Sequence, residues 1–108
     1  MILFPCPYFG SEVEFTDERI AHVTDRHPDL LPAHLDRIGK TLVDPDLVRV
    51  STKMATAREL SRWYADLLSG EHVVVVVATG KNPRERPRII TAYIARRLAK
   101  GQVEWNRS

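Results

Sequence analysis

The chain has 108 residues, the length of one domain, which we take to span residues 1–108, and its 44% apolar content argues against global disorder. The net charge of +2 is unevenly distributed: residues 81–108 carry eight Lys/Arg against two Glu (8 − 2 = +6), so residues 1–80 carry +2 − 6 = −4. This asymmetry is what a phosphate-binding face would produce, and a solvated basic strand and loop would produce it equally.

The compartment is indicated by the N-terminal residues and by the cysteine count. Cys6 is a single cysteine and excludes an intrachain disulfide, which fits a reducing compartment. The first residues lack a basic region and reach a proline at Pro5, so we expect no signal peptide. The valine run 73–77 is too short to cross a bilayer. These features predict a cytoplasmic protein without a membrane partner.

Two helices are expected in the first half of the chain. Ser11–Phe15 alternates polar and apolar residues and suits a short edge strand or an extended lead-in. Thr16 is a good N-cap for a helix that runs to about Arg26. Pro32 can begin a second helix, which the Asp-Pro-Asp sequence starting at Asp44 closes.

The second half of the chain reads as consecutive strands. Four segments combine β-branched or aromatic residues with alternation or a continuous apolar run, namely Leu47–Ser51, Glu59–Leu67, His72–Thr79 and Arg88–Arg96. Short connections make neighbouring strands antiparallel. The predicted fold class is therefore α+β, with the N-terminal helices packed on one face of a four-stranded antiparallel sheet. A last short segment is expected to pack Val103 and Trp105 onto the core.

The face of this sheet away from the helices is expected to gather polar side chains. Along their strands, Arg49 and Thr91 alternate with apolar residues and therefore point away from the core. Ser51 and Tyr93 share that side, and Arg62 and Tyr64 can reach it as well. An open polar face ringed by arginines suits RNA binding.

The first helix carries two histidines five residues apart. His22 and His27 are separated by roughly 140° around an ideal helix, so they cannot both point squarely at one atom. We favour His22 as the proton-transfer group, with Arg26 one turn later as a phosphate partner. Alternatively, His22 pairs with Glu18 in solvent, and His27 caps the helix C-terminus. No His/Cys cluster has the spacing of a zinc site, so we expect no metal and no other cofactor.

Several short motifs occur together in a recognisable order. They are His22-Val-Thr-Asp-Arg-His27-Pro, Asp44-Pro-Asp-Leu-Val, Ile90-Thr-Ala-Tyr and Lys100-Gly-Gln-Val-Glu-Trp. From about His22 to Trp105 the chain resembles the small bacterial and phage-associated domains grouped as barnase/EndoU/colicin/RelE-like nucleases. The resemblance implies helices on a four-stranded antiparallel sheet, metal-independent RNA cleavage, and the toxin of a toxin–antitoxin or phage-conflict system. The implied partners are RNA, whether ribosome-associated or tRNA, and a cognate antitoxin protein.

The expected reaction is attack of an RNA 2′-hydroxyl on the adjacent phosphorus, which gives a 2′,3′-cyclic phosphate. Histidine suits both proton transfers because its pKa lies near neutrality. The candidate catalytic residues are His22, His27, Arg49 and Thr91, with Arg49 as the fixed cation and Thr91 positioning a hydroxyl or a phosphate oxygen. The candidate RNA-binding residues are Arg26, Tyr64, Tyr93, Arg84 and Arg86. A non-catalytic RNA- or partner-binding module on the same sheet, or a nuclease whose site has decayed, would share much of this pattern.

Overall fold

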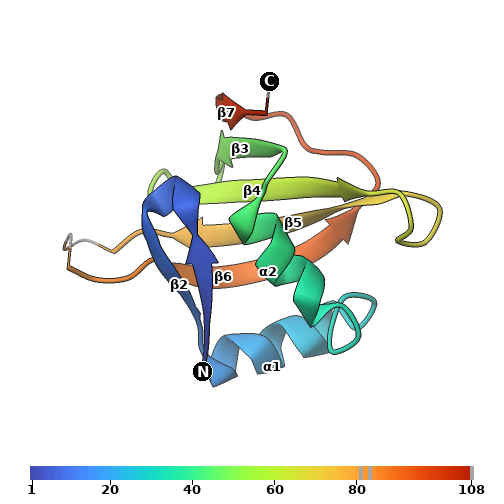
Figure 1. Cartoon of the computed structure of the whole chain (residues 1–108), viewed down its shortest axis with the longest axis horizontal. Coiled ribbons are helices and arrows are strands. Elements are labelled where there is room, and N and C mark those ends of the chain that lie inside the picture. The colour runs from blue at the N-terminus through green and yellow to red at the C-terminus, as the bar shows by residue number, and fades with distance from the viewer. Residues whose placement is uncertain (81, 83, 108) are drawn as a thin grey trace.

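The computed structural model describes residues 1–80, 82 and 84–107, and within them one sheet is accompanied by two short helices (Figure 1). The elements are β1 (Ile2–Cys6), the 3-10 turn η1 (Pro7–Phe9), β2 (Ser11–Phe15), α1 (Asp17–Arg26), α2 (Leu35–Val43), β3 (Leu47–Val50), β4 (Ala57–Tyr64), β5 (Glu71–Ala78), β6 (Arg88–Ala95) and β7 (Val103–Asn106). The seven strands form one sheet in the order β1-β2-β6-β5-β4-β3-β7. Neighbours are antiparallel except β2 and β6, which are parallel, so the sheet is mixed.

The four strands predicted in the second half correspond to β3, β4, β5 and β6, and their ends differ from the predictions by up to three residues. They pair as successive antiparallel neighbours, as their short connections predict. The valine-rich β5 is central, between β4 and β6, and most of its residues are buried. An apolar run on both faces of a strand therefore marked the middle of the sheet correctly.

The prediction of a four-stranded antiparallel sheet is wrong because three more strands join it. β2 is an interior strand between β1 and β6, not an edge strand or a lead-in. β1 was not predicted because Pro5 lies within it and Pro7 directly follows it. At the edge of a sheet, however, a proline can be accommodated, because the position of its missing N–H can face solvent. The β1–β2 turn closes through Gly10, whose φ of +62° favours glycine.

The core lies between the helices and one face of the sheet. α2 packs against β1, β4 and β5, while α1 packs against β6. In Figure 1, α2 crosses in front of the central strands, and the β1–β2 hairpin curls toward it. Gly39 permits this curl, because a Cβ at that position would lie 2.8 Å from the Phe4 ring. Fully buried side chains from both layers fill the space, including Phe15, Val23, Ile38, Leu42, Leu60, Val75 and Ile89.

The helix boundaries follow the sequence signals at three of four ends. Thr16 caps α1 by accepting the Arg19 N–H at 3.3 Å, and α1 ends at Arg26 as predicted. α2 ends at Val43 before Asp44. Its start is three residues later than the prediction at Pro32, because the preceding residues form turns. Neither helix in the described part of the chain is long and apolar enough to cross a membrane.

The C-terminal strand does not pack into the core as expected. Val103 and Trp105 remain 48% and 41% exposed. β7 pairs with β3 at the outer edge of the sheet, and neither helix packs closely against it. Val103 and Trp105 are therefore exposed because β7 lies at the edge of the sheet.

Candidate functional site

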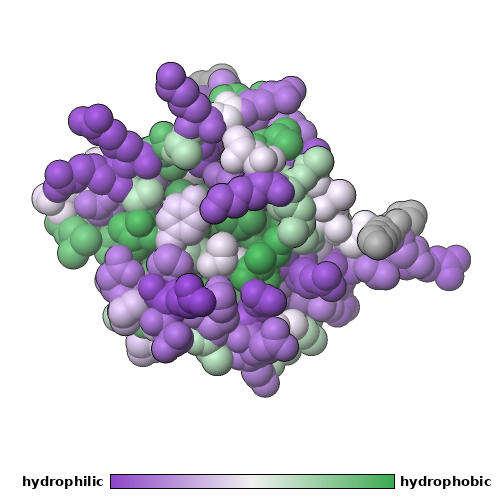
Figure 2. Space-filling model, turned by 180° about the vertical axis from the view of Figure 1, so that it is seen from behind, coloured by the Kyte–Doolittle hydropathy of each residue, from purple (hydrophilic) through white to green (hydrophobic). Residues whose placement is uncertain are grey.

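The sheet face turned away from α2 carries a cavity of about 380 Å³. Part of its lining comes from β4, β5 and β6, from residues that alternate with those facing the helices. These residues include Glu59, Val76, Thr91 and Tyr93. The β3–β4 turn supplies the opposite wall: Ser51, Thr52, Lys53 and Met54. Figure 2 shows this open face, where a hydrophobic centre is surrounded by hydrophilic side chains.

Thr91 and Tyr93 lie where alternation along their strand predicts. Thr91 is opposite Val76, Tyr93 is opposite Val74, and both line the cavity while remaining partly exposed. Burial raises the pKa of the Tyr93 phenol, the charge of Glu59 raises it further, and Arg49 opposes the shift. The phenol is therefore neutral at pH 7 and can donate a hydrogen bond.

Arg49 shares this face but is not the free cation that we expected. It is 3% exposed, and its Nη2 donates to Glu59 Oε1 at 2.9 Å. Its Nη1 donates to the Ala99 carbonyl, and its Nε has no partner among the described residues. The register of β3 and β4 places Glu59 directly opposite Arg49. This carboxylate compensates the buried guanidinium charge, which would otherwise be costly. The pair is neutral overall and borders the cavity through Glu59.

His27 is the histidine that the structure brings to this site. It ends α1 as the C-cap residue, where its backbone N–H donates to the Val23 carbonyl at 2.7 Å. Its imidazole also packs on Tyr93, with the ring centroids 5.9 Å apart. The helix stops before His27, and the ring is thus free to turn toward β6. His27 therefore occupies the expected C-cap position of α1, and its ring also lies beside the open face.

His22 and Arg26 are less closely connected to the cavity. His22 is partly buried on α1, and Arg26 is exposed in its last turn. Among the described residues, no hydrogen bond, ion pair or ring contact links either side chain to the cavity lining. The structure therefore brings His27, rather than the favoured His22, to Tyr93.

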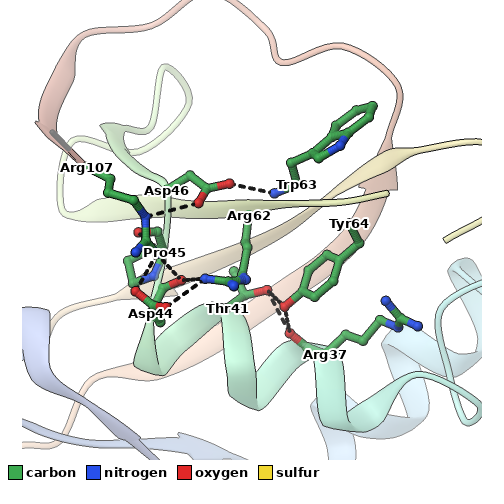
Figure 3. Close-up of polar contacts among 9 residues, drawn as sticks. All are labelled: Arg37, Thr41, Asp44, Pro45, Asp46, Arg62, Trp63, Tyr64 and Arg107. Carbon is green, nitrogen blue, oxygen red and sulfur yellow. Dashed lines mark hydrogen bonds and ion pairs between the residues drawn. The ribbon is translucent and has the colours of Figure 1, made fainter. Parts of the chain in front are cut away.

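Tyr64 points to the helix side of the sheet, which corrects its expected place on the open face (Figure 3). It is 6% exposed, and its hydroxyl lies 3.0 Å from Thr41 Oγ1 and donates to the Arg37 carbonyl at 3.1 Å. Arg62 is on the same side and binds Asp44. Tyr64 therefore anchors α2 to β4 and does not reach the cavity.

Arg84 and Arg86 lie in the β5–β6 connection beside the cavity. Met54 lines the cavity and also a neighbouring depression of about 330 Å³ that reaches Arg88 and Glu85. Arg84 and Arg86 line shallower depressions that share Glu85 with it. Arg86 Nη1 lies 3.5 Å from Glu14 Oε2, so part of its charge is compensated.

Glu59 and Lys53 are the charged cavity residues that sequence reasoning missed. Glu59 stood at the uncertain start of a predicted strand, and Lys53 fell in a turn. Ser51 was placed on the correct face, and its Oγ accepts the N–H groups of Lys53 and Met54 at 3.2 and 3.3 Å. Strand alternation places Glu59 on the same face as Ser61 and Trp63, but it does not show that this is the open face, because the other face carries Tyr64.

Within the described residues, no group of three or more His, Cys, Asp or Glu side chains is arranged to hold a metal ion. Comparisons of the chain with protein-family models, with curated proteins and with solved structures found no match. The chemistry of the open face must therefore be inferred from the geometry of its own residues.

Proposed function

We propose that the protein is a ribonuclease that cleaves RNA on the open face of its sheet, by attack of a 2′-hydroxyl on the adjacent phosphorus. The observation that carries the proposal is the cavity lined by Thr91, Tyr93 and Glu59, with the His27 ring packed on Tyr93. An imidazole can transfer protons at a phosphodiester, and hydroxyl groups can donate hydrogen bonds to its oxygens. The products would be a 2′,3′-cyclic phosphate and a 5′-hydroxyl.

In this proposal His27 accepts the proton of the attacking 2′-hydroxyl and returns it to the 5′-oxygen when the bond from that oxygen to phosphorus breaks, because one imidazole can act first as a base and then as an acid. The phenol of Tyr93, whose pKa is raised by burial and by Glu59, donates to a phosphate oxygen. Thr91 orients the attacking hydroxyl from the neighbouring position on β6. Positioned proton transfer contributes about 10²–10⁴-fold to a rate.

The cation for the phosphate is Lys53 in this scheme. Lys53 lines the cavity and has an exposed side chain, while Arg49 is committed to Glu59. Arg49 acts one step away: it holds Glu59 in place and its charge opposes the rise in the Tyr93 pKa. We therefore assign Arg49 a positioning role in place of direct contact with phosphate.

The test is incubation of the purified protein with 5′-labelled RNA in EDTA, followed by analysis of the product ends. We expect 2′,3′-cyclic phosphate termini, and loss of about 10²–10⁴-fold in rate for His27→Gln. His34→Gln is the matched control, because His34 is the N-cap of α2 on the other side of the sheet. His22→Gln measures the role of the histidine that the sequence favoured. Full activity of a folded His27→Gln variant would remove His27 from the mechanism.

A non-catalytic RNA-binding module on the same face is the second candidate. The Arg49–Glu59 ion pair favours it, because the carboxylate in the cavity lining is already paired, and Lys53 is the other charged residue among the described lining residues. RNA that is retained by the protein but recovered intact, in EDTA and with added Mg²⁺, would support this candidate over the ribonuclease.

A further inference from the structure

Two aromatic side chains stand together on the open face, outside the cavity lining. Trp63 on β4 is opposite His72 on β5, and their rings meet edge to face with centroids 4.9 Å apart. Trp63 is 45% exposed, at the end of β4, where pairing with β5 continues but pairing with β3 has ended at Ser61. In Figure 3 the side chains of Trp63 and Tyr64 leave β4 in different directions, with Tyr64 turned to α2. An indole on the open side of the sheet is not needed to fill the core, which lies on the helix side.

The position of the Trp63 indole is fixed by its surroundings. Gly70 has a φ of +100°, and a Cβ there would lie 2.5 Å from Trp63 Cζ2, so only glycine lets the ring lie against this turn. The Trp63 backbone N–H donates to Asp46 Oδ2 at 2.8 Å, and Arg107 Nε lies 3.4 Å from Asp46 Oδ1. The ring is thus held against the β4–β5 turn with its remaining surface exposed.

A cation and a further aromatic ring adjoin this pair. His72 is opposite Ala95, the last residue of β6, and the exposed Arg97 follows two residues later. Arg96 is directed elsewhere, because its Nε lies 3.9 Å from Oε1 of Glu71, which is opposite Tyr64 on the helix side. Tyr93, two residues before Ala95 on β6, is the diagonal neighbour of His72. The aromatic pair therefore adjoins the cavity residue Tyr93 and lies near the end of β6, where Arg97 can contact phosphate.

The environment of the His72 imidazole favours its uncharged form, which suits stacking. Burial lowers its pKa, Asp46 and Glu71 oppose this, and Arg49 lowers the pKa further. Aromatic rings near an arginine match the chemistry of single-stranded nucleic acid, in which bases stack and phosphates pair with cations. A protein partner would need no such combination of a stacking surface with positive charge.

We propose that Trp63 and His72 form a subsite for one unpaired nucleobase of an RNA strand whose neighbouring phosphate lies on Arg97. This inference rests on the proposed function, since it places a flanking nucleotide of the same substrate. The subsite selects single-stranded RNA, because a base within a duplex is not free to lie on the indole.

The test uses Trp63 as its own reporter. Trp105→Phe removes the other tryptophan, which is on edge strand β7, and leaves Trp63 as the only indole. The probes are a 2′-O-methyl oligouridine, which has no attacking hydroxyl, and an abasic oligonucleotide of the same length and charge. We expect the base-bearing probe to quench Trp63 emission and the abasic probe to leave it unchanged.

Affinity of the full chain for the same oligouridine gives the second readout. Trp63→Leu should weaken binding roughly 5- to 150-fold, because stacking on one base is worth about 1–3 kcal/mol. Trp63→Tyr should restore most of the affinity, and Trp105→Leu should not change it. Circular dichroism of each variant checks that it is folded.

The outcomes separate this inference from the proposed function. Equal quenching by both probes would show that the effect comes from phosphate charge, and it would overturn the subsite. Trp63 emission that changes with protein concentration alone would indicate that a second copy of the chain covers this surface, and it would also overturn the subsite. Cleavage of RNA without any response of Trp63 would overturn the subsite and leave the ribonuclease intact. A base-dependent response without cleavage would retain the subsite and reject the ribonuclease.

Discussion

Removal of the Glu59 carboxylate is the most direct test of the charge pair beneath the open face. Glu59→Ala leaves the Arg49 guanidinium, whose side chain is 4% exposed, without its carboxylate. Loss of one partner of a buried pair costs about 3–5 kcal/mol. The Ala99 carbonyl still accepts one N–H of Arg49, so we expect about 3 kcal/mol, near the lower limit.

This loss of stability converts into a change that thermal unfolding can measure. With an unfolding entropy of about 2.1 cal/mol/K per residue, a chain of 108 residues has about 0.23 kcal/mol/K. The melting temperature of Glu59→Ala should then fall by about 13 °C. Circular dichroism during heating and urea unfolding followed by tryptophan fluorescence give independent values.

Two controls show whether the pair itself is responsible. Glu12→Ala removes an exposed carboxylate from β2 and should change stability by no more than about 0.5 kcal/mol. The double variant Arg49→Met/Glu59→Leu removes both charges and should recover much of the loss, because no unpaired charge remains buried. If Glu59→Ala melts with the Glu12→Ala control, or the double variant is less stable than Glu59→Ala, the reasoning about this pair is refuted.

Thr91→Val keeps the β-branched shape and should reduce RNA turnover while leaving stability within about 0.5 kcal/mol, so unchanged turnover would remove the hydroxyl from the mechanism. Cleavage should persist in excess EDTA, and a strict requirement for added Mg²⁺ would contradict acid–base catalysis by side chains alone. Arg84→Ala with Arg86→Ala should reduce the slope of log affinity against log salt by up to about 1.4, at about 0.7 per lost phosphate contact. Arg86 should contribute less than Arg84 because Glu14 lies 3.5 Å away, and a slope equal to that of the parent would show that RNA does not reach this connection.

Local patterns were sufficient for the strands of the second half and for the faces of three site residues. A strand turns its side chains alternately to two sides, so Arg49, Thr91 and Tyr93 were assigned to the correct face from their apolar neighbours. The same reasoning was insufficient for β4, because each of its faces carries a large aromatic side chain. Only packing on α2 shows that Tyr64 is inside and Trp63 outside.

The sequence by itself determined where α1 begins and ends, where β3 to β6 lie, and that Thr91 and Tyr93 point away from the core. These features depend on caps, prolines and a two-residue period, which act between near neighbours in the chain. The tertiary structure decided which strands join the sheet, since the parallel contact of β2 with β6 links Glu14 to Arg88 across most of the chain. It also decided that Glu59 neutralises Arg49 and that His27 meets Tyr93, because register and helix packing bring distant residues together and no local pattern records them.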